Sequence, residues 1–370
     1  MANFETDVLI AGGGPAGLAA AIAARQQGLR VLVADVAKPP IDKACGEGLM
    51  PDSLQALSGL GVSLEGLNTG KFEGIRFLGS NRTVEALFPN GVGLGIRRTL
   101  LHTALIERAA QVGASLAWET RVEATPGGAV TTNGKPVRYR WLVGADGYDS
   151  RIRKFARLEA GNAYERRIGL RRHFRVQPWS KFVEIYWGEN CQVYVTPIAN
   201  DQVCVAVIAK RRPKSFETAV SQFPDLSARL GEGEVISSVR GAVTVSQRFR
   251  AVTNGRVALI GEASGSADAI TGEGLAMCFR QAIALGEALA QQNLTLYEQE
   301  HRRIMSLPQF MGRAMLLMDR SRWVREHTLG ALSTRPQIFD RMLSVHVGAV
   351  PLAKFGIDTA LGLGWQMLRG

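Results

Sequence analysis

The sequence predicts an α/β fold with three parts: a parallel-sheet domain assembled from separated segments, an inserted antiparallel β-sheet and a helical C-terminal region. Three observations lead to this prediction. Residues 7–11 form a short apolar run that leads directly into a glycine-rich turn and an alanine-rich stretch. Residues 161–250 change to a succession of strand-like runs, and residues 256–260 return to the first pattern with another glycine turn. We therefore expect the second part to interrupt the first.

The first glycine turn has the spacing of a dinucleotide-binding site. It follows a strand-like run, and Gly12, Gly14 and Gly17 fit the pattern G-x-G-x-x-G. The first glycine permits a tight turn, the second lets the backbone approach a pyrophosphate, and the third lets helix and strand pack closely. Asp35 ends the next strand, where a ribose acceptor is expected. The predicted contacts are Gly12, Gly14, Pro15, Ala16, Gly17 and Asp35.

The composition is that of an ordinary globular protein. The chain has 370 residues, of which 46% are hydrophobic and 21% are charged, enough for a large core and about two domains. Its four cysteines and five histidines lack the spacing of a disulfide framework or a metal site, so we predict no metal. No stretch has the length and apolarity of a membrane span, and the N-terminus lacks a signal-peptide pattern. We expect a cytoplasmic protein.

The formal charge of +11 suggests anionic partners. On a strand, Arg171, His173 and Arg175 would share one face. No nucleic-acid-binding signature accompanies this basic stretch, so nucleic acid is not predicted as a partner. We expect instead a solvated sheet face that attracts anions or an anionic membrane surface. The arginines of the stretch are Arg166, Arg167, Arg171, Arg172 and Arg175.

The other elements of the first domain are predicted from periodicity and from residues that end helices. Residues 18–27 form a helix that a glycine closes, and residues 31–34 form a buried strand. A loop rich in proline and glycine leads to a helix over 51–60. Residues 99–112 form an amphipathic helix. Strands are expected over 71–78, 83–87, 115–118, 129–131 and 139–145.

The inserted part consists mainly of strand-like runs, over 168–176, 182–187, 192–197, 202–209 and 235–245. Residues 215–230 have a helical pattern, as do residues 274–291 after the return strand. The order of elements gives the domain boundaries. The first domain is predicted over 1–72, 95–160 and 250–300, the inserted domain over 73–94 and 161–249, and the helical region over 301–370.

Four motifs in order resemble those of the class A flavoprotein monooxygenases. Asp146, with Ser150 and Arg153 after it, resembles their D-G-x-x-S-x-[VI]-R stretch. Gly261 opens a turn like their second glycine motif, and Arg98 begins a helix of the pattern R-x-x-L-x-x-x-L. With the first turn, the motifs cover most of the chain. The resemblance implies the p-hydroxybenzoate hydroxylase fold, with a Rossmann-like FAD-binding domain and an inserted antiparallel β-sheet substrate domain.

The resemblance also implies FAD as cofactor and NAD(P)H as electron donor. Asp146 would accept hydrogen bonds near the pyrophosphate and ribose, and Arg98 would offset phosphate charge. Glu262 stands where the family usually has aspartate and would meet the ribityl hydroxyls through a longer arm. The helix at Gly274 would point its free N–H groups at the flavin. The implied contacts are Cys45, Gly46, Arg98, Asp146, Gly261, Glu262, Gly272, Glu273 and Gly274.

Within this superfamily, residues 43–46 are similar to the geranylgeranyl reductase branch. Three residues are therefore candidates for the chemistry: Cys45, Glu47 and Tyr194. Each has a structural alternative, namely a loop turn, a salt-bridged acid and ordinary strand packing. The prenyl reductases carry an aromatic motif, Y-x-W-x-F-P, of which residues 192–197 keep one aromatic and the proline.

Because this motif is incomplete, we place first an NAD(P)H-using monooxygenase that acts on a lipophilic or phenolic small molecule. The alternatives are a geranylgeranyl reductase-type enzyme that saturates prenyl double bonds and a non-catalytic prenyl or lipid carrier. Intact second and third glycine turns count against the carrier. Apolar residues at helical spacing over 357–368 indicate core packing, a pocket cap or a peripheral membrane contact. The oligomeric state is left open.

Overall fold

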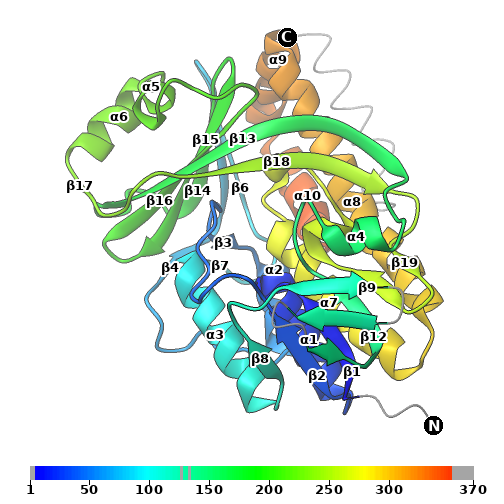
Figure 1. Cartoon of the computed structure of the whole chain (residues 1–370). Helices are drawn as coiled ribbons and strands as arrows, with labels where there is room; N and C mark the ends of the chain where they lie inside the picture. The colour runs from blue at the N-terminus through cyan, green and yellow to red at the C-terminus, as the bar shows by residue number, and fades with distance from the viewer. Residues whose placement is uncertain (1–4, 126–127, 132–134, 352–370) are drawn as a thin grey trace.

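A six-stranded sheet lies at the base of the molecule in the computed structural model, which describes residues 5–125, 128–131 and 135–351 (Figure 1). In sheet order its strands are β19 (Thr253–Asn254), β20 (Val257–Leu259), β12 (Tyr139–Gly144), β1 (Thr6–Ala11), β2 (Val31–Ala34) and β8 (Ser115–Ala117). All pairs are parallel except β19 with β20, and Val8 of β1 pairs with both Trp141 and Val31. The parallel strands bring their carboxyl ends to one edge.

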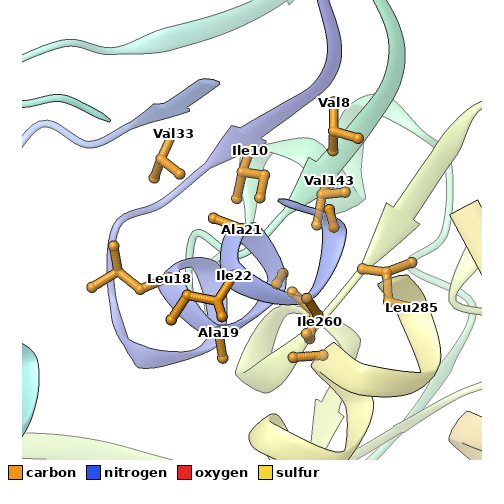
Figure 2. Packing of buried hydrophobic residues seen from close by; sticks show 14 of the residues in the cluster. Val8, Ile10, Leu18, Ala19, Ala21, Ile22, Val33, Val143, Ile260 and Leu285 are labelled. Carbon is orange, nitrogen blue, oxygen red and sulfur yellow. The ribbon is translucent and has the colours of Figure 1, made fainter. Parts of the chain in front are cut away.

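Helices pack around this sheet and against one another. They are α1 (Pro15–Gln26), α2 (Pro51–Gly59), α3 (Arg98–Gln111), α4 (Arg151–Phe155) and α7 (Gly274–Ala290). Figure 2 shows Ala21 and Ile22 of α1 beside Ile10 of the sheet, in a core that α7 completes. A Cβ added to Gly286 of α7 would lie 2.9 Å from the backbone of Ala23, so small residues let α1 and α7 pack closely.

Two small sheets flank the first. One contains β9 (Val122–Thr125), β10 (Gly128–Thr131) and β11 (Pro136–Val137). The other has the order β3 (Gly48–Leu49), β7 (Gly93–Ile96) and β4 (Thr69–Phe72). Glycines let this second sheet approach the inserted domain, because a Cβ on Gly95 would lie 1.8 Å from the carbonyl oxygen of Pro197.

The inserted domain is built on a nine-stranded sheet. Its strands are β21 (Gly265–Ser266), β18 (Arg240–Phe249), β13 (Gly161–Arg175), β16 (Gln202–Ala209), β15 (Cys191–Ala199), β14 (Phe182–Trp187), β5 (Gly74–Leu78) and β6 (Thr83–Leu87), with β17 (Glu234–Val235) paired to β13. The pair β14–β5 is parallel and the others are antiparallel.

The two faces of this sheet have different neighbours. Helices α5 (Phe216–Val220) and α6 (Pro224–Gly231) cover one face, where Phe216 packs with the valines of β15 and β16. The other face turns toward the rest of the molecule (Figure 1). There Phe77 contacts Trp187, with ring centroids 5.7 Å apart, and Phe339 at 4.8 Å. This second face is the one that borders the cavity described below.

The helical C-terminal region comprises α8 (Leu294–Arg320), α9 (Arg322–Thr334) and α10 (Pro336–His346). Two short 3₁₀ turns, η1 (Gly261–Ser264) and η2 (Ala269–Thr271), precede α7. Among the described helices, none combines the length and the apolar character needed to cross a bilayer. The helical pattern predicted over 357–368 lies outside the described residues.

The predicted fold class is confirmed, and four elements differ from their predictions. Strand β13 begins at Gly161, seven residues before its predicted start at residue 168. Residues 71–78 belong to two strands in different sheets, β4 and β5. Glycine is needed where β5 begins, because a Cβ on Gly74 would lie 2.0 Å from the carbonyl oxygen of Ala86 on the paired strand β6. Residues 215–230 are two helices, since Pro224 begins a new one. The strand predicted over 235–245 begins five residues later, as β18 over Arg240–Phe249. The short strands β3, β7 and β9 were not predicted.

Candidate active site

A cavity of about 670 Å³ lies between the carboxyl edge of the six-stranded sheet and the inserted sheet. The first turn, the loop before β3, the start of α3, the end of β12 and the turns before α7 border one part of it. Strands β13 to β16 and β18 border the other part. The cavity therefore joins a side rich in glycine turns to an apolar side.

The three glycines of the first turn have two different roles. Gly12 has φ +111°, and a Cβ there would lie 2.3 Å from the carbonyl oxygen of Ala145. A Cβ on Gly17 would lie 1.8 Å from the carbonyl oxygen of Gly12, so both positions need glycine for packing. Gly14 borders the cavity, and a Cβ there meets no described atom within 4 Å. Pro15 and Ala16 also line the cavity, where α1 begins.

Asp35 also borders the cavity and is fixed in place. Its carboxylate accepts hydrogen bonds from the backbone N–H of Gly13 at 2.6 Å and of Ala37 at 2.7 Å. Each oxygen keeps a further lone pair for a hydroxyl donor. His102 was not predicted: its Nε2 lies 2.8 Å from the Gly13 carbonyl, and its burial lowers its pKa. A neutral His102 that donates to this carbonyl supports the turn from α3.

The remaining predicted contacts come together around the same cavity. The Asp146 carboxylate accepts from the N–H of Arg151 at 2.7 Å, at the start of α4. Arg153 joins this turn to the next one by donating to the carbonyl of Ala263 at 3.1 Å. Glu262 forms a half-exposed ion pair with Lys43 at 2.6 Å. The predicted contacts that line the cavity here are Cys45, Gly46, Arg98, Asp146, Gly261, Glu262, Gly272 and Gly274.

Glu273 lies in the third turn, but its side chain is buried elsewhere. Its carboxylate is 3.6 Å from Nδ1 of His346 on α10. Burial, followed by the charge of Asp52, raises the pKa of Glu273 well above its usual value. Glu273 does not line the cavity, although its neighbours Gly272 and Gly274 do, so this predicted contact is not brought to the cavity.

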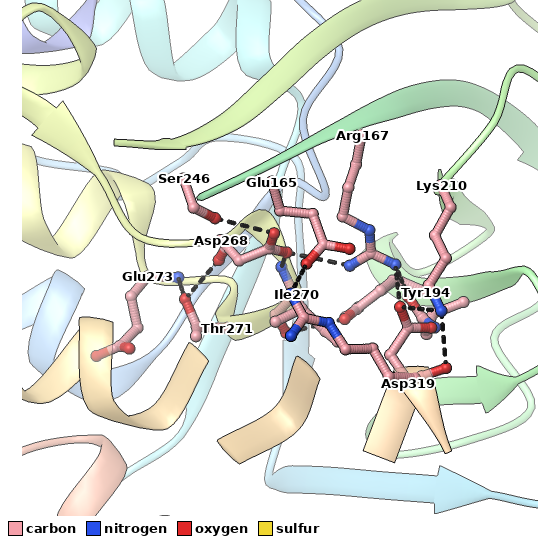
Figure 3. Close-up of polar contacts among 12 residues, drawn as sticks. Glu165, Arg167, Tyr194, Lys210, Ser246, Asp268, Ile270, Thr271, Glu273 and Asp319 are labelled. Atoms are coloured by element: carbon pink, nitrogen blue, oxygen red, sulfur yellow. Dashed lines mark hydrogen bonds and ion pairs between the residues drawn. The ribbon is translucent and has the colours of Figure 1, made fainter. Parts of the chain in front are cut away.

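A buried ion network holds the turn η2 at the edge of the cavity (Figure 3). The guanidinium of Arg167 lies 3.0 Å from Asp268 and 3.5 Å from Asp319. Asp268 in turn accepts the N–H of Ile270 at 3.0 Å, and Tyr194 donates its hydroxyl to the Ile270 carbonyl at 2.8 Å. Strands of the inserted sheet and helix α8 thereby fix one cofactor-side turn.

The aromatic residues on strands β14 and β15 of the inserted sheet have two kinds of surroundings. Tyr194 lines the cavity. Tyr186 and Trp187 do not: the hydroxyl of Tyr186 donates to Glu184 at 2.8 Å, and Trp187 packs on Phe77. Tyr186 and Trp187 therefore belong to the packing of the inserted domain, and Tyr194 is the aromatic residue of these strands that meets the cavity.

The loop that carries Cys45 is anchored by Glu47. Cys45 lines the cavity, and its carbonyl accepts the thiol of Cys204 at 3.6 Å. Glu47 has φ +60° and is buried. Its carboxylate accepts the N–H of Arg98 at 2.9 Å and lies 2.7 Å from Nε2 of His173. These contacts hold a left-handed, non-glycine residue against the start of α3 and against β13.

His173 is the centre of this cluster. Its Nδ1 lies 2.6 Å from a guanidinium nitrogen of Arg97 and 3.1 Å from one of Arg171, so Nδ1 accepts and Nε2–H donates to Glu47. Glu47, His173 and Cys204 offer ligand atoms within 4.8 Å of one another. The two positively charged guanidinium groups beside the histidine would repel a bound metal ion. We therefore interpret the cluster as a support for the Cys45 loop.

The expectation of a solvated basic face is wrong for the central residues of β13. Arg167, Arg171 and His173 are at most 2% exposed. Each is buried because carboxylates from distant parts of the chain compensate its charge or accept its proton, as Asp42 does for Arg171. Arg175, in contrast, is exposed.

Replacement of Glu47 by alanine is expected to lower stability by about 1–3 kcal/mol, because the backbone N–H of Arg98 and the buried Nε2–H of His173 lose their acceptor. Alkylation of Cys45 should also become faster as the loop loosens. Glu119 is a matched control, since it has a similar φ of +54° but an exposed side chain. Denaturant unfolding of both variants checks this. Equal midpoints for Glu47→Ala and Glu119→Ala would contradict the anchoring role.

Comparison with known proteins identifies the cofactor domain. A family of FAD-binding domains matches residues 5–294. The chain belongs to this FAD-binding family. A menaquinone reductase of Mycolicibacterium smegmatis is 27% identical over 307 residues, 74% of this chain and 73% of the relative. A digeranylgeranylglycerophospholipid reductase of Thermoplasma volcanium is 26% identical and covers 92% of this chain and 91% of its own. A hispidin-3-hydroxylase of Neonothopanus nambi is 34% identical over 42% of this chain and 41% of its own.

Solved structures share the fold. A flavoprotein/dehydrogenase from Cytophaga hutchinsonii superposes with a TM-score of 0.83 at 19% identity, over 98% of this chain and 100% of its own. The 2-methyl-3-hydroxypyridine-5-carboxylic acid oxygenase gives 0.73 at 22% identity, over 86% and 93% of the two chains. The predicted resemblance to class A flavoproteins and their reductase-like relatives is thereby confirmed.

The residues around the cavity fit an FAD. A Cβ on Gly14, Gly46 or Gly274 would meet no described atom within 4 Å, which leaves room for a ligand against the backbone. Nε of Arg98 is buried and has no hydrogen-bond partner among the described residues, so a donor is free for the ligand. Neither α1 nor α7 has an acidic residue in its first turn to oppose an anionic group. The protein is an FAD-dependent oxidoreductase of this family.

Proposed function

We propose that the chain is a reductase that saturates a carbon–carbon double bond in the isoprenoid chain of a lipid. The observation that carries the proposal is the apolar side of the cavity. Leu170, Val183, Ile185 and Ile208 line it, and among the described residues no charged side chain from the inserted sheet does so. An isoprenoid chain is recognised by apolar contact and needs no charged partner.

The relatives support the same assignment. The menaquinone reductase and the digeranylgeranylglycerophospholipid reductase are named for reactions on prenylated lipids, and they match along 74% and 92% of this chain. The hispidin-3-hydroxylase matches along 42%. The larger matched shares of the two reductases favour reduction. The sequence analysis placed hydroxylation first because the aromatic motif is incomplete.

Saturation adds a hydride and a proton to the two carbons of a double bond. FAD, reduced by NAD(P)H, supplies the hydride when it is bound. We assign proton delivery to the thiol of Cys45, which lines the cavity. Glu47 and His173 hold the loop of Cys45, and the apolar lining excludes the water that would compete as proton donor.

Hydroxylation of a lipophilic or phenolic substrate is the second candidate. Thr196 and Thr244 bring hydroxyl groups to the cavity from the inserted sheet, and these can orient a polar substrate. A carrier without turnover ranks third, because a carrier needs no flavin. Gly14, Gly46 and Gly274 leave room for a ligand against the backbone, as a flavin site requires.

Product analysis tests the proposal. The holoenzyme, supplied with NADPH and a menaquinone under anaerobic conditions, is expected to give a product that is heavier by two hydrogens in the side chain, measured by mass spectrometry. A product that forms in air and carries one atom of labelled oxygen would contradict the reductase and support the hydroxylase.

Replacement of Cys45 by serine is expected to lower turnover by about 10²–10⁴-fold, the usual contribution of a positioned proton donor. FAD content should be unchanged, since serine preserves the shape of the side chain. The control is Cys191→Ser, because Cys191 is buried in the inserted domain away from the cavity. Equal turnover of both variants would mean that Cys45 does not deliver the proton and has only a structural role.

A further inference from the structure

We propose that α8 and the start of α9 form a docking face for a membrane that contains anionic phospholipids. The face is an uninterrupted stripe along α8. Exposed residues recur at 303, 306, 310, 313, 317 and 320, with the spacing of three and four that keeps residues on one side of a helix. They are Arg303, Ser306, Phe310, Arg313, Leu317 and Arg320.

Two of these residues are large apolar side chains that face solvent. Phe310 is 52% exposed and Leu317 is 57% exposed, two helical turns apart. Trp323, which follows at the start of α9, is 54% exposed and stacks on His327 with ring centroids 4.1 Å apart. Apolar side chains between arginines on one helix face are typical of helices that lie in the interface of a bilayer.

The charge of this face has one dominant sign. Residues 301–325 contain six arginines, of which Arg325 is buried, and a single acid, Asp319, which is 2% exposed. Three carboxylates from neighbouring positions pair with arginines of the face: Glu298 with Arg302, Glu300 with Arg303 and Glu165 with Arg320. The arginine of each pair is exposed, so its remaining N–H groups can reach a lipid phosphate. The face therefore complements an anionic surface rather than a neutral one.

A hollow beside Phe310 provides a place for a lipid headgroup. It measures about 160 Å³, and Arg248 of β18 together with Arg302 and Arg313 of α8 contributes to its lining. Ser306 and Gln309 add polar groups from the same helix. Guanidiniums are the side chains best suited to phosphate oxygens. Phe310 lines the same hollow, so one lipid could meet arginine with its headgroup and phenylalanine with its chains.

The docking face lies outside the cavity, since no residue of α8 or α9 lines the latter. The proposal therefore does not rest on the assignment of the reductase, and the two can fail separately. If both hold, the docking face brings the enzyme to the membrane in which a prenylated lipid resides.

Vesicle co-sedimentation of the FAD-loaded protein tests the docking face. The wild type is expected to bind vesicles of phosphatidylcholine with phosphatidylglycerol and to bind pure phosphatidylcholine vesicles weakly. Phe310→Ser with Leu317→Ser should weaken binding by more than about tenfold, because both apolar contacts are lost. Arg303→Gln should weaken it by about fivefold, and added salt should have the same effect.

The matched control is Leu87→Ser with Val235→Ser. Both residues are 49% exposed, on β6 and β17 of the inserted sheet, so this variant loses a comparable apolar surface elsewhere. It should bind as the wild type does. Unchanged FAD content in all variants shows that they fold.

Three results would overturn the proposal. The first is wild-type protein that stays in the supernatant with the mixed vesicles. The second is equal binding by the wild type and the Phe310/Leu317 variant. The third is a dimer, seen by analytical ultracentrifugation without lipid, that the Phe310/Leu317 variant abolishes, since the face would then belong to a second copy of the chain.

Discussion

Replacement of Gly14 by valine is expected to give a folded protein that no longer binds FAD. A Cβ at this position meets no described atom within 4 Å, so the substitution should cost the protein little packing. The side chain would, however, enter the cavity at the start of α1, where the backbone has to approach the pyrophosphate. We expect FAD affinity to fall by at least about a hundredfold, which corresponds to ~3 kcal/mol. Flavin absorbance of the purified protein measures this.

Two other glycines separate the effect on the cofactor from the effect on the fold. Gly231→Val also places valine in open space, at the end of α6, and should keep its FAD. Gly17→Ala would bring a Cβ to 1.8 Å from the Gly12 carbonyl oxygen, so this variant is expected to misfold. A yellow Gly14→Val protein would mean that the pyrophosphate does not approach this turn.

The first turn could be predicted from the sequence because its physical requirements are local. The spacing of Gly12, Gly14 and Gly17 follows from one tight turn and one helix start, and Asp35 ends the adjacent strand. The same holds for the second and third turns, whose positive φ values at Gly261 and Gly272 only glycine adopts without strain. The structure distinguishes Gly14, which borders the cavity, from Gly12 and Gly17, which are needed for packing. The spacing alone does not make this distinction.

The buried charges could not be predicted, because their partners are remote. Alternation along β13 correctly grouped Arg171 with His173 on one face, but it does not say which face is buried. That depends on Asp42 and Glu47, more than a hundred residues earlier in the chain. Glu273 shows the same limit: both neighbours are glycines of the cofactor turn, yet its carboxyl lies beside His346.

Replacement of Arg167 by alanine is expected to destabilise the protein by about 3–5 kcal/mol. Its guanidinium is completely buried between Asp268 and Asp319, and Lys210 is the other cation of the network, 3.2 Å from Asp319. Without the arginine, Asp319 keeps Lys210, whose side chain is 30% exposed, while Asp268 loses the cation that Arg167 supplies. An uncompensated buried charge of this kind destabilises a protein by this amount. Denaturant unfolding of the FAD-loaded protein measures the loss.

The change should also reach the cofactor. Asp268 accepts the N–H of Ile270 and so fixes the turn η2, of which Ala269 and Thr271 line the cavity. We therefore expect weaker FAD binding by Arg167→Ala as well as lower stability. Arg166→Ala is the matched control, because the neighbouring side chain points to solvent from the same strand. Surface substitutions of this kind typically change stability by no more than about 0.5 kcal/mol. Equal unfolding midpoints for the two variants would mean that the buried network does not hold the turn.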